Sequence, residues 1–154
     1  MTRSSPAAVG ALLALGFVPW VVLASAPGDL TFVMSWGLLN TTPWHVLGFP
    51  SYLEQTQGLA SLPWSLQVWP LSFAFYVGAL ASAAGGAVVG REDVRLTVGL
   101  LVLSTVGSLV LWWGFVERGA TGVIPVGFVA TAVVCWWVYW PRLRGSRVGG
   151  IDTR

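Results

Sequence analysis

Four long apolar stretches alternate with short polar segments along the chain. They cover residues 6–26, 66–89, 94–116 and 122–140, and none carries a charged side chain near its centre. A helix that crosses the roughly 30 Å hydrocarbon layer of a bilayer needs about 20 such residues. The pattern predicts an all-α fold, a polytopic membrane protein whose four transmembrane helices form a single membrane domain of residues 1–154.

Local signals agree with the expected helix ends. Pro6 suits the first turn of a helix, and Asp93 is the expected N-cap of the third helix. Gly90 is typical of the position just after a helix, and Pro141 ends the fourth stretch. The second and third helices are therefore expected to be joined by a tight connection.

The first stretch also fits a second interpretation, a cleaved signal peptide of residues 1–26. Ala24-Ser25-Ala26 is an A-x-A pattern of the kind found at cleavage sites. The apolar run is longer than the usual roughly 7–15 residues of a signal peptide, and Pro19-Trp20 interrupts it. Both interpretations leave residues 27–65 on the same outer face.

Residues 27–65 form a long connection in a chain whose other connections are short. Residues 30–39 are rich in apolar side chains but too few to span, which is typical of an interfacial or re-entrant segment. Ser51 and Glu54 fit a capping box that opens a short helix reaching about Gln57. We expect this 39-residue outer loop to form a cap over the mouth of the bundle.

Composition and charge support a membrane location. Hydrophobic residues make up 55% of the chain and charged residues 9%, whereas soluble domains carry about 25% charged residues. A soluble globule and a disordered chain are therefore both excluded. The basic residues are arginines without an interleaved aromatic stripe, so nucleic acid is not an expected partner.

The arginines predict an orientation. Arg118 is the one arginine expected on the outer side, and the remaining seven of the eight lie at the opposite ends of the four helices. The positive-inside rule then places the protein in the cell membrane with both N- and C-termini, including the tail 141–154, in the cytoplasm. Membrane lipids are therefore expected partners.

The chain holds little chemistry for catalysis or transport. His45 is the single histidine and Cys135 the single cysteine, so neither a bis-histidine haem site nor a thiolate metal cage can form within one chain. The centres of the expected spans lack the ionisable residues that pumps and ion-coupled carriers use. We expect no catalytic set, no cofactor and no metal.

Candidate functional residues gather in the outer cap, where a polar or aromatic side chain can meet a partner: Asp29, Trp36, Asn40, Trp44, His45 and Glu54. Asn40-Thr41-Thr42 also matches the acceptor tripeptide for N-glycosylation. The same residues, followed directly by Pro43, fit a turn better, and glycosylation stays open as the alternative.

Small residues predict a helix-packing face on the second helix. Gly78, Ser82 and Gly86 recur at four-residue spacing and therefore share one face. Membrane helices associate by close packing at such small-residue faces. The partner helix can belong to this chain or to another protein.

Four strings of residues resemble an uncharacterised family of small haloarchaeal integral membrane proteins: Phe17–Trp20, Ser35–His45, Gly90–Asp93 and Trp136–Pro141. The resemblance covers nearly the whole chain. It implies an archaeal protein whose gene often lies beside that of the archaeosortase, a membrane enzyme that processes surface glycoproteins. It carries no catalytic residues over, and Cys135 has no arginine nearby that would match the archaeosortase itself.

The leading functional hypothesis is a non-enzymatic membrane accessory or interaction protein, linked through the resemblance to the sorting or anchoring of archaeal cell-surface proteins. Its partner would be a membrane protein such as the archaeosortase, or a second copy of the chain. A second hypothesis is a membrane-surface enzyme that uses Asp29, His45 or Glu54 on a lipid or a lipid-linked substrate. A third is an oligomeric carrier or channel for small solutes.

Overall fold

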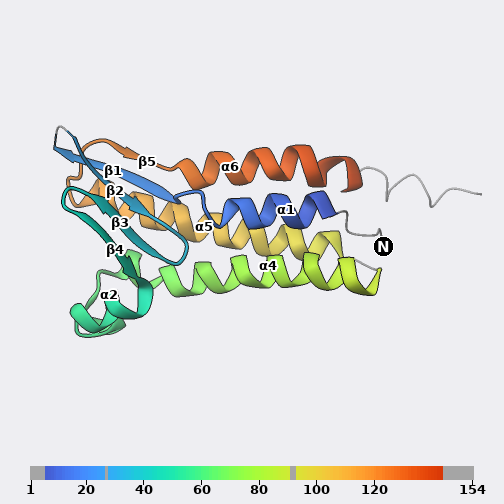
Figure 1. The fold of residues 1–154 in the computed structure, drawn as a ribbon, viewed down its shortest axis with the longest axis horizontal. Coiled ribbons are helices and arrows are strands. Elements are labelled where there is room, and N and C mark those ends of the chain that lie inside the picture. Colours follow the sequence, from blue (N-terminus) through green and yellow to red (C-terminus); the bar gives the residue numbers. More distant parts are fainter. Residues whose placement is uncertain (1–5, 27, 91–92, 144–154) are drawn as a thin grey trace, which may run out of the picture.

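The computed structural model describes residues 6–26, 28–90 and 93–143. Four helices lie side by side along the long axis, and a small sheet with a short helix occupies one end (Figure 1). The helices are α1 (Pro6–Leu15), α2 (Phe49–Gln55), α3 (Trp64–Gln67), α4 (Trp69–Val89), α5 (Val94–Glu117) and α6 (Val126–Val134). A 3₁₀ turn, η1 (Leu59–Ser61), precedes α3, and a π-helical turn, η2 (Cys135–Tyr139), extends α6.

Within the described residues, three helical segments are long and apolar enough to cross a membrane: Trp64–Val89, Val94–Glu117 and Val126–Leu143. They correspond to the second, third and fourth expected spans. The third has the predicted N-cap, because the Asp93 carboxylate accepts hydrogen bonds from the backbone N–H groups of Arg95 and Leu96 at 3.1 and 3.2 Å. Gly90 ends α4 in the left-handed conformation, as expected for a glycine at that place.

The expected first span, residues 6–26, is wrong as a single helix. Helix α1 has ten residues and a length of about 15 Å, half of the hydrocarbon layer. The chain turns at residues 16–20 and continues as strand β1 (Val21–Ala26). Pro19 lacks the backbone N–H that a continuing helix would need, which explains a break in this region.

The all-α fold class is also corrected by a five-stranded antiparallel sheet. Its other strands are β2 (Asp29–Val33), β3 (Gly37–Thr41), β4 (Trp44–Gly48) and β5 (Val123–Ile124). The strand order is β4-β3-β2-β1-β5. Three of the five strands therefore lie in the predicted outer loop of residues 27–65, and the last strand lies near the start of the expected fourth helix.

Strand β1 holds the sheet together, because it pairs with β2 on one side and with β5 on the other. Cleavage after Ala26 would remove both α1 and this strand. The signal-peptide interpretation would thus leave β2 and β5 without the strand that joins them.

The short helix of the cap begins earlier than the capping box predicts. Helix α2 starts at Phe49, with Gly48 as its N-cap, Pro50 in its first turn and no side-chain cap. Proline at this place costs no hydrogen bond, since the first N–H groups of a helix are unpaired. The chain leaves the helix through Gln57 and Gly58, which both have positive φ values.

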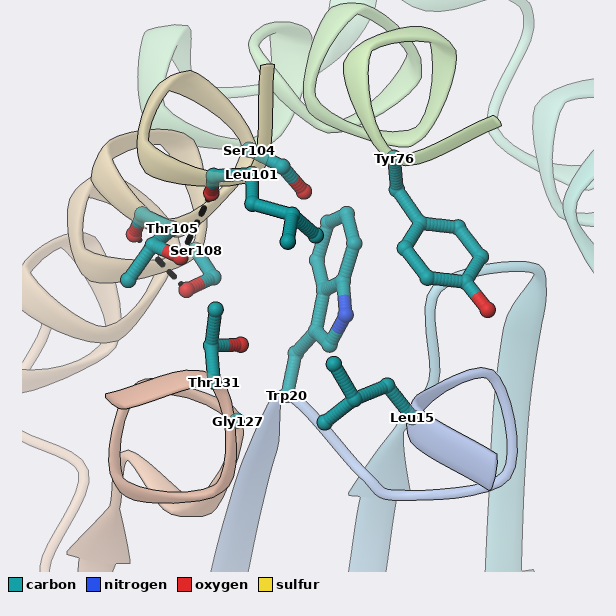
Figure 2. Close-up of a pocket in the computed structure, with 9 residues that line it drawn as sticks. All are labelled: Leu15, Trp20, Tyr76, Leu101, Ser104, Thr105, Ser108, Gly127 and Thr131. Carbon is teal, nitrogen blue, oxygen red and sulfur yellow. Dashed lines mark hydrogen bonds between the residues drawn. The ribbon is translucent and has the colours of Figure 1, made fainter. Parts of the chain in front are cut away.

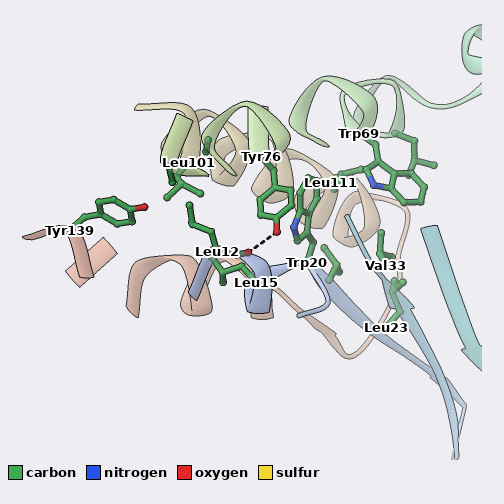
Figure 3. Packing of buried hydrophobic residues seen from close by; sticks show 14 of the residues in the cluster. Leu12, Leu15, Trp20, Leu23, Val33, Trp69, Tyr76, Leu101, Leu111 and Tyr139 are labelled. Carbon is green, nitrogen blue, oxygen red and sulfur yellow. Dashed lines mark hydrogen bonds between the residues drawn. The ribbon is translucent and has the colours of Figure 1, made fainter. Parts of the chain in front are cut away.

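The core runs without interruption from the helices into the sheet. Leu12, Tyr76 and Leu101 fill its helical part, and Trp69 and Val33 fill the part beneath the sheet (Figure 3). Each of these five residues is at most 7% exposed. The sheet is thus packed onto the bundle rather than tethered to it.

The chain passes four times along the bundle although it has three candidate spanning helices. The described ends, Pro6 and Leu143, lie at the end of the bundle opposite the sheet, together with the α4–α5 connection (Figure 1). Helix α1 and β1 together make the first passage. Arg95 and Arg142 lie at the end of the bundle opposite the sheet, and Arg118 lies at the sheet end. The other five arginines fall outside the described residues.

Candidate interaction surface

Trp69 joins the cap to the bundle. This residue opens α4 and is fully buried. Its indole N–H donates to the backbone carbonyls of Met34 and Ser35 in the β2–β3 turn, at 3.1 and 3.2 Å. The rings of Phe49 and Tyr52 on α2 pack against it with centroid distances of 5.1 and 5.7 Å. One side chain therefore fixes both the sheet and α2 on the first turn of α4.

Arg118 supports the same region from the end of α5. Its Nη1 atom donates to the Ser65 hydroxyl at 2.9 Å, and its guanidinium lies 4.9 Å from the centre of the Phe115 ring. Burial raises the pKa of Tyr52 above its usual value of 10, and the positive charge of Arg118 opposes this shift.

Helix α1 ends inside the bundle, where backbone groups cannot pair with bulk water. The Tyr76 hydroxyl donates to the Leu12 carbonyl at 2.6 Å, and the Trp36 indole donates to the Gly16 carbonyl at 3.2 Å. The carbonyls of Leu13, Ala14 and Leu15 accept from the next three turn residues. The backbone carbonyls at this helix end are therefore paired with hydrogen-bond donors of the same chain.

Gly16 makes the contact with Tyr76 possible. A Cβ atom at this position would lie 2.8 Å from the Tyr76 oxygen. Sequence reasoning did not single out Tyr76 or Gly16, because the two are far apart in the chain. The one available signal was the Gly16–Pro19 segment, which is a poor helix former.

A small cavity lies beside this helix end, between α1, α4, α5 and α6. Hydroxyl groups of Ser104, Thr105, Ser108 and Thr131 line one side of it, and Trp20 and Tyr76 the other (Figure 2). About 10 Å³ is free for the centre of a water-sized sphere, which is the room of a single water molecule. The cavity is too small to be a substrate site.

The predicted small-residue face of α4 lies against α5. The Ser82 hydroxyl lies 2.9 Å from the Thr97 hydroxyl, and a Cβ on Gly78 would lie 3.4 Å from Leu100. Gly86 is buried on the same helix. The partner of this face is thus a helix of the same chain.

Two further contacts of this kind escaped sequence analysis. Ser72 packs directly on Gly107 and Ser65 on Gly114, so a Cβ on either glycine would overlap the serine side chain. Both pairs have the same antiparallel register as Ser82 with Thr97. The seven-residue spacing of Ser65 and Ser72 and of Gly107 and Gly114 was the signal that could have revealed them.

The cap candidates do not form one site. Asp29 begins β2, Trp36 lies in the β2–β3 turn, and exposed Glu54 lies on α2. Asn40 and His45 are direct cross-strand partners on β3 and β4. Strand β3 separates Asp29 from His45, and two strand spacings amount to about 10 Å. Among the residues that the structure describes, no group of three or more His, Cys, Asp or Glu side chains could hold a metal ion.

Asn40 lies within β3, and the turn itself is formed by Thr42 and cis Pro43. The Oδ1 atom of Asn40 is buried and has no hydrogen-bond partner among the described residues. Glycosylation of Asn40 stays a prediction. The turn interpretation placed Asn40 in the turn, but the chain reverses slightly later, at the two residues that follow Thr41.

The outer half of β4 is the most open part of the sheet. Trp44 and His45 at this end are exposed, with 70% of Trp44 accessible. Helix α2 follows β4 directly and contacts it, and the Phe49 N–H donates to the Trp36 carbonyl at 3.0 Å, which extends the β3–β4 ladder by one residue at its inner end. An edge strand carries unpaired backbone N–H and C=O groups, so its free half can pair with another chain.

Exposed tryptophans mark both ends of the bundle. Trp64 and Trp113 lie at the sheet end, and Trp136, Trp137 and Trp140 at the other. Such rings prefer the headgroup level of a bilayer. Cys135, the first residue of η2, is half-buried and lines an apolar groove between α5 and α6.

These features define the class: a protein whose described residues include three helices long and apolar enough to span a membrane, with a small sheet at one end of the bundle. The chain belongs to the family described as domain of unknown function (DUF8050), whose model matches residues 1–148. No curated protein and no solved structure matches the chain.

Proposed function

We propose that this protein is a non-enzymatic accessory protein of the cell membrane that binds a partner protein through its outer cap. In this proposal the sheet faces the cell exterior and both termini lie in the cytoplasm. Arg95 and Arg142 at the end opposite the sheet support this orientation, as does the excess of arginines in the segments next to them.

The open half of β4 is the observation that carries the proposal. Natural proteins usually cover or charge an edge strand, because it can pair with other chains. Here Trp44 and His45 remain exposed on this edge, while Trp69 holds the sheet rigidly on the bundle. A rigid, open edge with an exposed tryptophan suits the addition of an extended segment of a partner.

The identity of the partner rests on the family resemblance. We propose a membrane protein of the machinery that sorts or anchors archaeal surface proteins, such as the archaeosortase. A second copy of this chain is the alternative partner. The enzyme hypothesis gains no support from the placement of Asp29, His45 and Glu54 on separate elements. The small cavity also gives no support to the carrier hypothesis.

Site-specific photocrosslinking in the native membrane tests the proposal. A photoreactive amino acid at His45 is expected to capture one protein, identified by mass spectrometry. The matched control is Gln55, an equally exposed position at the end of α2. Capture of the same proteins from both positions, or of none from His45, would contradict partner binding through β4.

Deletion of the gene tests the partner's identity separately. We expect incomplete processing or anchoring of surface glycoproteins, restored by the wild-type chain and not by a Trp44→Asp variant. This substitution removes the exposed indole and places a charge on the free edge of β4, which disfavours pairing with another strand. Normal processing in the deletion strain would refute the sorting role and leave the crosslinking result standing on its own.

A further inference from the structure

The sheet has an apolar face on the side opposite the helices. One residue from each strand forms a row across it, each side chain directly beside the next: Ile124, Val22, Phe32, Leu39 and Val46. Val46 and Ile124, at the two edges, are 47% and 57% exposed. The adjacent row, which includes Val21 and Val33, points into the core, so this end of the sheet is apolar on both faces.

The polar residues of the sheet gather at its other end. Asp29, Thr41, Thr42 and His45 lie at or next to the tips of the hairpins, away from the helices. Figure 1 shows that β1 leaves the end of α1 and runs outward, so Val22 lies near the bundle and the turns lie far from it. The sheet therefore changes from apolar to polar along its strands.

Two hydrogen bonds and one sequence position place the apolar end of the sheet at the level of the candidate spanning helices. Trp69, which bonds to the β2–β3 turn, lies five residues or about 8 Å inside the candidate span Trp64–Val89. Trp36 of the same turn bonds to the end of α1, a helix of half the membrane thickness. Ile124 comes two residues before the candidate span that starts at Val126.

We propose that this row, which we call the sheet's lipid face, contacts the lipids of the outer leaflet at the boundary between headgroups and acyl chains. Lipid there requires that the strand edges at this depth be covered. Helix α2 contacts β4, and β5 packs against α5.

The proposal is independent of partner binding at the tips, and lipid quenching tests it. On a Cys135→Ala background, Val46→Cys and Ile124→Cys carry the fluorophore NBD, and Thr42→Cys at the hairpin tip is the control. The labelled full-length proteins are reconstituted in phosphatidylcholine vesicles. Because Val46 and Ile124 lie on opposite edges of the sheet, a folding defect in one variant leaves the other as a test.

We expect nitroxide-labelled lipids to quench the two row positions several-fold more than Thr42, and aqueous iodide to quench Thr42 several-fold more than the row. NBD at the two row positions should also emit at shorter wavelengths than NBD at Thr42. Equal iodide quenching at all three sites would overturn the proposal, because the row would then face water. Equal lipid quenching at all three would overturn the depth that we assign to the sheet.

Discussion

The hydroxyl of Tyr76 on α4 donates a 2.6 Å hydrogen bond to the carbonyl of Leu12 on α1. The bond lies at the depth where α1 stops and the chain turns toward the sheet (Figure 3). It supplies a donor to one of the carbonyls that a continuing helix would have paired. A half-length helix is thereby tolerated in the bundle.

Tyr76→Phe should lower the free energy of unfolding by about 1 to 2 kcal/mol, because it leaves the Leu12 carbonyl buried without this donor. Unfolding in mild detergent, followed by circular dichroism, measures the change. Tyr52→Phe is the control, since it removes a half-buried hydroxyl that forms no such bond to any of the described residues. Equal losses in both variants would argue against a capping role for Tyr76.

Gly107→Ala should destabilise the protein by about 1–3 kcal/mol, because the new Cβ would overlap Ser72. Gly99→Ala on the same helix has open space and should be neutral or slightly stabilising. Thermal unfolding of the two variants side by side distinguishes packing from helix propensity. If Gly107→Ala is as stable as Gly99→Ala, α4 and α5 do not approach as closely as described.

Trp69→Phe should loosen the cap while the spanning helices remain. It removes the indole N–H from two backbone carbonyls, a loss of about 2 kcal/mol. Limited proteolysis in vesicles should then cut within residues 28–62 faster than in the wild type. Trp64→Phe, at a 59% exposed position, should leave the cutting rate unchanged. If Trp69→Phe is cut at the wild-type rate, Trp69 does not anchor the cap.

Tyr52 should make stability fall at alkaline pH. Burial raises its pKa in the folded protein above 10, so the folded state holds the phenolic proton more tightly than the unfolded state. The contribution is present below about pH 10 and is lost as the pH rises through the folded pKa. The unfolding temperature of Tyr52→Phe should therefore decline less than that of the wild type in this range. Parallel declines would contradict a buried Tyr52.

The sequence predicts the helices whose signals are local. Helix α5 has an N-cap at Asp93 and an uninterrupted apolar run, and its observed end lies one residue from the predicted one. The end of α4 follows from Gly90 in the same way. Such features depend on a few neighbouring residues, which a single sequence displays.

The sheet could not be predicted because its signals are shared with helices. Residues 21–26 are apolar and suit a membrane helix, and only pairing with β2 and β5 makes them a strand. Both faces of the inner sheet are apolar, so the alternation that usually marks a strand is missing. Pro19 and the turn pairs Gly28-Asp29 and Thr42-Pro43 were the available clues.

The packing contacts were predicted for one face and missed for the other. Gly78 and Ser82 follow the four-residue spacing that is easily recognised. Ser72 and Gly107 meet across two helices, and this pairing depends on the antiparallel register of α4 and α5. The register follows from the three-dimensional packing of the two helices.

The sidedness of the bundle is the most direct test of the proposed topology. In that topology α1 and β1 make the first crossing, and the sheet lies outside the cell. Single cysteines at Thr42 and Val89, on the Cys135→Ala background, report the two ends of the bundle. In intact cells a membrane-impermeant maleimide should label Thr42→Cys, and it should label Val89→Cys only after lysis. Labelling of Val89→Cys in intact cells, with Thr42→Cys protected or equally labelled, would contradict the account.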